Sequence, residues 1–118
     1  MQWIADLIAW FYCLYLRTRY NYVLAFRKGP ACFYVAADEK TRKAHRDENI
    51  IAHAYGTNVF ARSRRALTRG VVRHELKHVQ QYMQSKGWFL VEYPRELWRV
   101  GYYKNKYERA ARRAEKRP

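Results

Sequence analysis

The sequence predicts a small α+β domain, because one long helical segment is followed by two pairs of short strands and then by further helices. We expect the sheet to be short and mostly antiparallel. The 118 residues have the length of a single domain, 1–118. Hydrophobic residues make up 49% of the chain and aromatic residues 17%, enough to bury a core, which excludes a wholly disordered protein.

The first predicted element is an apolar helix within residues 1–20. Its apolar residues follow helical spacing, and the opposite side is also largely apolar. This pattern predicts a central core helix, with a helix docked on a membrane surface or a partner as the alternative. The apolar run is too short to span a membrane and lacks the flanks of a signal peptide, so we expect a cytoplasmic or assembly-associated protein.

Four short strands are predicted between residues 20 and 61. The first two, over 20–26 and 31–36, form a hairpin around a turn at Gly29 and Pro30. The second pair covers 49–55 and 59–61. Residues 38–48 are highly charged and indicate a solvated loop or a short helix. The two cysteines, Cys13 and Cys32, lie in apolar stretches and are predicted to be buried, reduced thiols.

Three helices are predicted in the second half of the chain, over 66–86, 94–103 and 106–116. Gly87 is the expected residue after the first of them, and Asn105 is the expected N-cap of the last. The first of these helices contains the motif H-E-x-x-H at residues 74–78. At about 100° per residue, its apolar residues gather on a face separate from the two histidines. This predicted core stripe consists of Val72, Leu76, Val79 and Met83.

The H-E-x-x-H motif predicts a zinc site. His74 and His78 are four residues apart, so both imidazoles project from one face and can bind one zinc ion. Glu75 is offset by about 100°, beside the metal. There it can act as the general base that takes a proton from water, while zinc acts as a Lewis acid. A surface pair of histidines with no metal is the alternative.

Zinc needs a third protein ligand. The other histidines, His45 and His53, lie upstream of the motif, and the candidates downstream of it are glutamates. Glu108 is the best of them, because it lies in the first turn of a slim, alanine-rich helix that can pack antiparallel on the helix of the H-E-x-x-H motif. Asn105 and Glu108 also fit a capping box that needs no metal, so a capping role for Glu108 stays open. The remaining candidates are Glu92, Glu96 and Glu115.

H-E-x-x-H followed about thirty residues later by a helical glutamate resembles the gluzincin metallopeptidases, the thermolysin-like zincins. The short chain is most similar to their minimal single-domain members, the minigluzincins, over residues 49–115. The resemblance implies one zinc per chain on His74, His78 and Glu108, with Glu75 as general base, a peptide or protein substrate, and residues 56–61 as the upper-rim strand. It also implies a tyrosine or histidine that stabilises the oxyanion, for which the candidates are Tyr93, Tyr102, Tyr103 and Tyr107.

The charge of the chain suggests a second kind of partner. Its net charge is +14, and residues 62–118 contribute 16 basic and 5 acidic side chains. Weak contact with polyanions or a membrane surface is therefore expected, although no motif for specific nucleic-acid recognition accompanies it. A basic binding module, or an inactive zincin within an assembly, is the alternative to an enzyme. The basic clusters are Arg62, Arg64, Arg65 and Arg69, and Arg109, Arg112, Arg113, Lys116 and Arg117.

Overall fold

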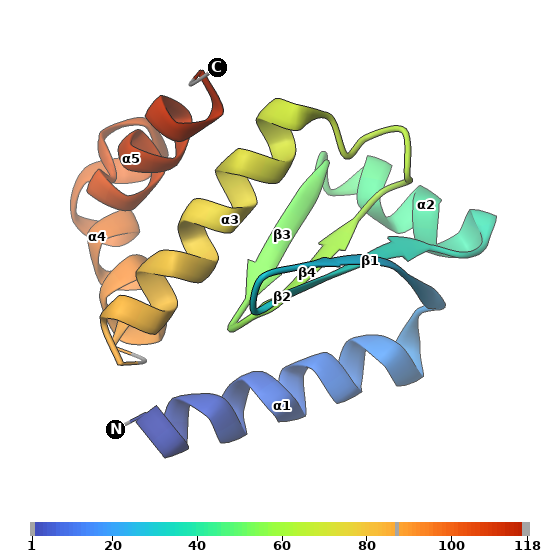
Figure 1. Cartoon of the computed structure of the whole chain (residues 1–118), viewed down its shortest axis with the longest axis horizontal. Coiled ribbons are helices and arrows are strands. Elements are labelled where there is room, and N and C mark those ends of the chain that lie inside the picture. Colours follow the sequence, from blue (N-terminus) through green and yellow to red (C-terminus); the bar gives the residue numbers. More distant parts are fainter. Residues whose placement is uncertain (1, 87, 117–118) are drawn as a thin grey trace.

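A computed structural model of the chain describes residues 2–86 and 88–116; Gly87, the predicted end of a helix, and Arg117 lie outside the described residues (Figure 1). The predicted α+β class is confirmed. The elements in order are α1 (Gln2–Arg19), β1 (Tyr22–Lys28), β2 (Ala31–Ala36), α2 (Glu39–Asp47), β3 (Ala52–Tyr55), β4 (Asn58–Ala61), α3 (Arg69–Gln84), α4 (Phe89–Lys104) and α5 (Lys106–Glu115).

The sheet has four strands in the order β1-β2-β4-β3. The hairpins β1–β2 and β3–β4 are antiparallel, as predicted, and β2 pairs with β4 in parallel, so the sheet is mostly antiparallel. Strand β4 is therefore internal and β3 is an edge strand. The resemblance gave the upper-rim role to residues 56–61, but the strand at the edge of the sheet is the preceding one.

Helices cover both faces of the sheet. Phe33 and Val59 point from the sheet toward Val72 and Val79 of α3, and these residues form the largest core cluster. On the other face, Phe60 packs against Cys13 and Leu16 of α1. Figure 1 shows α1 below the sheet, α3 to the upper left of the strands, and α4 and α5 further left, on the outer side of α3. The sheet thus holds α3 in a fixed position between itself and α5.

Three helices differ from what the sequence predicted, and side-chain caps define the starts of two of them, α2 and α3. Helix α3 begins at Arg69 and not at residue 66, because the hydroxyl of Thr68 accepts a hydrogen bond from the backbone N–H of Val71 at 3.2 Å. The charged segment 38–48 forms α2, which Asp38 caps in the same manner. Helix α4 begins at Phe89, earlier than the predicted residue 94, and Gly101 interrupts it with φ +80.

Two predictions about the core were wrong. Helix α1 is peripheral, because only a stripe of mostly small residues is buried and its large apolar side chains face outward. In α3, Met83 is 47% exposed, whereas Tyr82 is buried against α1 and hydrogen-bonds Asp6. The predicted burial of the two cysteines is confirmed for Cys13, whereas Cys32 is partly exposed. Among the described helices, none is both long and apolar enough to cross a membrane.

The approach of α1 to the β3–β4 turn predicts an effect on stability. Gly56 has φ +62, and a Cβ there would lie 3.0 Å from the Cβ of Ala9. Gly29 has a similar φ of +58 but open space around it. We expect Gly29→Ala to lower the free energy of unfolding by about 1–2 kcal/mol through the left-handed backbone alone. Gly56→Ala should lower it by about 1–3 kcal/mol more, because α1 must move. Urea denaturation measures both, and equal losses would contradict the proposed contact.

Candidate metal centre

Helices α3 and α5 pack antiparallel and bring His74, His78 and Glu108 together, as the spacing predicted. The Nε2 of His78 lies 2.7 Å from Oε1 of Glu108, and the Nε2 of His74 lies 3.2 Å from Oε2 of the same carboxylate. The ligand atoms of the three residues all lie within 4.8 Å of one another. Ala111, one turn further along α5, is fully buried, and its small side chain allows the close approach of the helices. This group can hold a metal ion.

The other ring nitrogen of each histidine also has an acceptor. Nδ1 of His74 lies 3.0 Å from Oε1 of Glu115, two turns after Glu108 on α5. Nδ1 of His78 lies 2.9 Å from Oε1 of Gln81, whose amide donates to the carbonyl of Tyr107 at 3.1 Å. Such outer contacts fix the orientation of metal-binding imidazoles and leave Nε2 as the ligand atom. The H-E-x-x-H motif alone did not predict a role for Gln81, and Glu115 was predicted only as a candidate ligand. The helical spacing fits both contacts, because Gln81 lies three residues after His78 and Glu115 lies seven after Glu108.

The arrangement calls for a cation between the rings and Glu108. A neutral imidazole has one N–H, yet each of these rings places both nitrogens within 3.2 Å of an acceptor oxygen. Either extra protons or one metal ion can occupy the point where the Nε2 atoms meet the carboxylate. Burial disfavours charge on His74, but the carboxylates of Glu108 and Glu115 outweigh it and raise the pKa of His74 to about 9. Burial would raise the pKa of Glu108, but both imidazoles hold it well below its usual range.

The role of Glu108 as a helix cap can be separated from its place in the cluster. Asn105 caps α5 alone, since its side-chain oxygen accepts from the backbone N–H groups of Tyr107 at 2.9 Å and Glu108 at 3.4 Å. In a capping box the Glu108 carboxylate would accept from the N–H of Asn105. That N–H donates instead to the carbonyl of Tyr102 at 3.3 Å. The carboxylate of Glu108 therefore faces the histidines and takes no part in the cap.

Glu75 lies beside the cluster and is not part of it. Its side chain is buried, and within the described part of the chain its Oε2 atom has no hydrogen-bond partner. Burial raises the pKa of Glu75, and the nearby imidazoles only partly oppose this effect. A buried carboxylate with a free oxygen and a raised pKa is suited to accept a proton from a small molecule bound next to it.

The cluster opens into a cleft of about 840 Å³ between the edge strand β3 and helices α3 and α4. Apolar side chains line most of the wall, including Ile51, which comes just before β3, and Leu90 and Leu97 of α4. The strand order leaves one edge of β3 unpaired within the described sheet, so its backbone groups border the cleft. The cleft is large enough to hold several residues of an extended peptide.

Two of the four candidate tyrosines lie at the cluster. The hydroxyl of Tyr93 donates to Oε1 of Glu108 at 3.0 Å. Tyr102 lines the cleft, and burial together with the neighbouring Glu108 raises its pKa to about 12, so its hydroxyl keeps its proton at neutral pH. Tyr103 is 79% exposed, and the hydroxyl of Tyr107 binds Glu92. The site therefore retains Tyr93 and Tyr102 as possible hydrogen-bond donors.

The remaining candidates lie outside the cluster. His45 and His53 stack on each other at 5.6 Å, and the hydroxyl of Tyr22 lies 2.7 Å from Nε2 of His45. The ring of His53 also packs edge-on against Phe60, on the sheet face covered by α1. Glu96, whose side chain is 13% exposed, pairs with the exposed Arg99 one turn further along α4.

The stacked pair of His45, which is buried, and His53, which is partly buried, predicts a loss of stability in acid. Burial, together with His45, lowers the pKa of His53 from 6.5 to about 4. Between pH 6.5 and 4, His53 is therefore protonated in the unfolded chain but not in the folded chain. The free energy of unfolding falls as the pH drops through this range. The slope is at most about 1.4 kcal/mol per pH unit. Urea denaturation should show a steeper loss between pH 7 and 5 for the wild type than for His53→Phe, which keeps a ring against Phe60. Equal slopes would exclude His53 as the cause.

Gln81 offers a prediction about the outer contacts. Replacing Gln81 with Leu removes the acceptor for Nδ1 of His78 and the link to α5. We expect the affinity for metal to fall about 10–100-fold, the usual cost of losing such a contact. Gln84→Leu, an exposed position at the end of α3, is the matched control and should bind metal as the wild type does. Competition with a chromophoric chelator measures both, and an unchanged affinity in Gln81→Leu would contradict this role.

Comparison with known proteins assigns neither a family nor a function to this chain. No family model, no curated protein and no solved structure matches this chain.

Proposed function

We propose that the protein is a zinc-dependent metallopeptidase of the gluzincin kind. The observation that carries this proposal is the position of Glu75, a buried carboxylate with an unpartnered oxygen next to three convergent ligand atoms. A site that held metal only to stabilise the fold would have no use for such a group, because burying an unpartnered carboxylate is costly. A hydrolytic site requires it.

The donor set favours zinc. Two imidazole nitrogens and one carboxylate oxygen are a common protein set for catalytic zinc, which keeps a further position open for water or substrate. Zinc held by His74, His78 and Glu108 would supply a Lewis acid. Glu115 and Gln81 would keep the two imidazoles oriented toward it.

Proton transfer, stabilisation of the carbonyl oxygen and binding of the peptide are carried out by the residues of the chain itself. Glu75 accepts a proton from the attacking water and later delivers it to the leaving amine. The hydroxyl of Tyr93 or Tyr102 donates a hydrogen bond to the oxygen of the carbonyl under attack. The edge of β3 can hold an extended peptide through backbone hydrogen bonds, while the apolar wall of the cleft accepts its side chains. These features together support a peptide or protein substrate.

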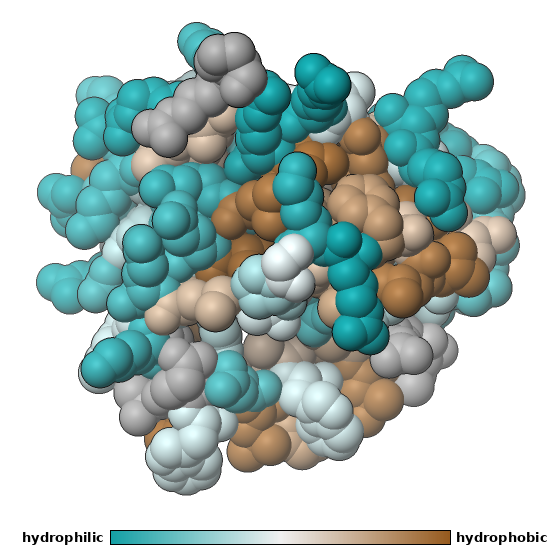
Figure 2. Space-filling model, in the orientation of Figure 1, coloured by the Kyte–Doolittle hydropathy of each residue, from teal (hydrophilic) through white to brown (hydrophobic). Residues whose placement is uncertain are grey.

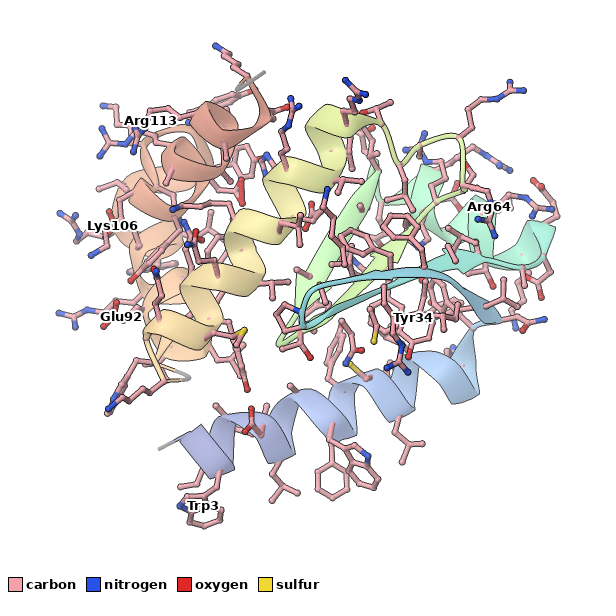
Figure 3. All side chains as sticks on the ribbon, viewed as in Figure 1. Trp3, Tyr34, Arg64, Glu92, Lys106 and Arg113 are labelled. Atoms are coloured by element: carbon pink, nitrogen blue, oxygen red, sulfur yellow. The ribbon has the colours of Figure 1, made fainter. Side chains whose placement is uncertain are left out.

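A basic binding module, or an inactive zincin within an assembly, remains the competing function. The net charge of +14 supports contact with anionic partners, but such contact would be weak and would decline steeply with salt. Figure 3 shows Lys106 and Arg113 pointing outward from α5, away from the sheet. The buried Glu75 carboxylate is better explained by the peptidase.

The proposal is tested by metal content and peptide cleavage measured on the same preparation. Elemental analysis should find about one zinc per chain, bound by the three ligands above. A peptide-library digest should show cleavage by the zinc-loaded protein, loss of cleavage after chelation, and recovery when zinc is returned. Zinc binding without cleavage of any peptide would favour the binding module or the inactive zincin.

A further inference from the structure

Helix α1 presents an apolar face to the outside of the molecule. Ala5, Ala9, Cys13 and Leu16 form the buried stripe against the sheet and α3. The rest of the helix surface, an arc of about 200°, contains no charged residue between Ile8 and Leu16. The outward apolar face consists of Trp3, Ile4, Leu7, Ile8, Trp10, Phe11, Tyr12, Leu14 and Tyr15, which are 38–70% exposed.

Contacts on the buried side fix the direction of this face. The hydroxyl of Tyr82 donates to Asp6, the amide of Asn58 lies 3.4 Å from the sulfur of Cys13, and Ala9 packs directly on Gly56. Helix α1 therefore cannot rotate to bury its larger side chains without breaking these contacts. Figure 3 shows Trp3 pointing away from the sheet. Nine adjacent exposed apolar residues are far more than the scattered ones expected on a protein surface.

The chemistry of the outward apolar face suits the surface of a lipid bilayer. Five of its nine side chains are aromatic, and the two tryptophans and two tyrosines combine an apolar ring with a polar group. This combination is enriched where acyl chains meet headgroups. In Figure 2 the lower edge of the molecule, along which α1 runs in Figure 1, is brown and pale, whereas teal side chains gather above it.

Charge decides between a bilayer and a second copy of the chain. Exposed basic residues lie near both ends of α1: Arg19 is its last residue, and Lys86 follows α3 between Tyr82 and Phe89, which pack against Ala5. A second copy would bring another net charge of +14 to the same face, which opposes association. Anionic lipid has the complementary sign and attracts each nearby basic residue by about 1 kcal/mol.

We propose that α1 lies in the surface of an anionic membrane, with its outward apolar face between the headgroups and the upper acyl chains. The helix then anchors the domain with the sheet above it. No described residue of α1 lines the cleft at the metal cluster, which is built from β3, α3, α4 and α5. The cleft therefore stays accessible to substrates while the protein is bound to the membrane. This inference is independent of the proposed peptidase activity.

The test is co-sedimentation of the full chain with lipid vesicles. Vesicles of phosphatidylcholine and phosphatidylglycerol should bind the protein, and vesicles of phosphatidylcholine alone should bind it more weakly. Binding to the anionic vesicles should weaken at an ionic strength of about 1 M, where charges are screened within about 3 Å. If the protein sedimented with neither kind of vesicle, the proposal would be overturned.

Matched aromatic-to-glutamate variants locate the contact. Trp3→Glu and Phe11→Glu each place a charge on the outward apolar face, and each should weaken vesicle binding at least about tenfold. Trp98→Glu is the control, because Trp98 is 91% exposed on α4 and outside that face; it should bind as the wild type does. Circular dichroism checks that each variant is folded. Equal binding by all three variants, or a concentration-dependent dimer that Trp3→Glu abolishes, would overturn the proposal.

Discussion

Replacing Glu75 with Gln should abolish peptide cleavage and leave the metal in place. The amide keeps the shape of the side chain but cannot accept a proton from the attacking water. Loss of a positioned general base costs about 10²–10⁴-fold in rate. Because Glu75 is not among the three clustered ligand residues, zinc content should not change. Glu75→Gln should also change the free energy of unfolding little. The neutral amide replaces a carboxyl group whose pKa is already raised by burial.

Three measurements on one preparation make this result decisive. The kcat/KM for a peptide found in the library digest, the zinc content and the thermal unfolding midpoint should be compared for wild type and Glu75→Gln. Glu96→Gln is the matched control, since Glu96 pairs with Arg99 outside the cleft and its variant should keep full activity. Equal kcat/KM for wild type and Glu75→Gln would remove Glu75 from the mechanism and, with it, the main support for a peptidase.

The cluster of His74, His78 and Glu108 could be predicted from the sequence because helical geometry is local and regular. Two histidines four residues apart must share a helix face, and the antiparallel packing of α5 then needs only small residues such as Ala111. The contact of Glu115 with His74 follows from the same rule, since Glu115 lies two turns after Glu108. What the sequence left open was whether Glu108 served the cap or the cluster, and only the position of the Asn105 backbone N–H resolves it.

Helix α1 and the sheet edge could not be predicted in the same way. The residues of α1 itself are apolar on nearly every side of the helix, so periodicity alone did not distinguish a central helix from a peripheral one. The packing of Ala5 and Ala9 shows that the small residues, not the large ones, face the protein. The order of strands depends on the parallel pairing of β2 with β4, a contact between segments distant in sequence. Such non-local contacts leave no periodic pattern in either strand.

Glu108→Ala should abolish tight metal binding while α5 stays folded. The carboxylate is the only acidic member of the cluster within the described residues, and it lies 2.7 Å from His78 and 3.2 Å from His74. Without it, two imidazoles alone must hold a divalent ion. Loss of a contact beyond the ligands costs up to about 100-fold in affinity, and removal of a ligand should cost more. Chelator competition measures the affinity, and cleavage should disappear at zinc concentrations that saturate the wild type.

Asn105→Ala provides the converse result, because Asn105 caps α5 and does not belong to the cluster. Loss of the cap should lower the free energy of unfolding by about 1 kcal/mol and reduce metal affinity much less than Glu108→Ala does. If instead Glu108→Ala bound zinc as the wild type does, the carboxylate would have only a structural role beside the histidines. The two variants separate these roles because the side-chain oxygen of Asn105 accepts from the backbone N–H groups at the start of α5, whereas the carboxylate of Glu108 faces the histidines.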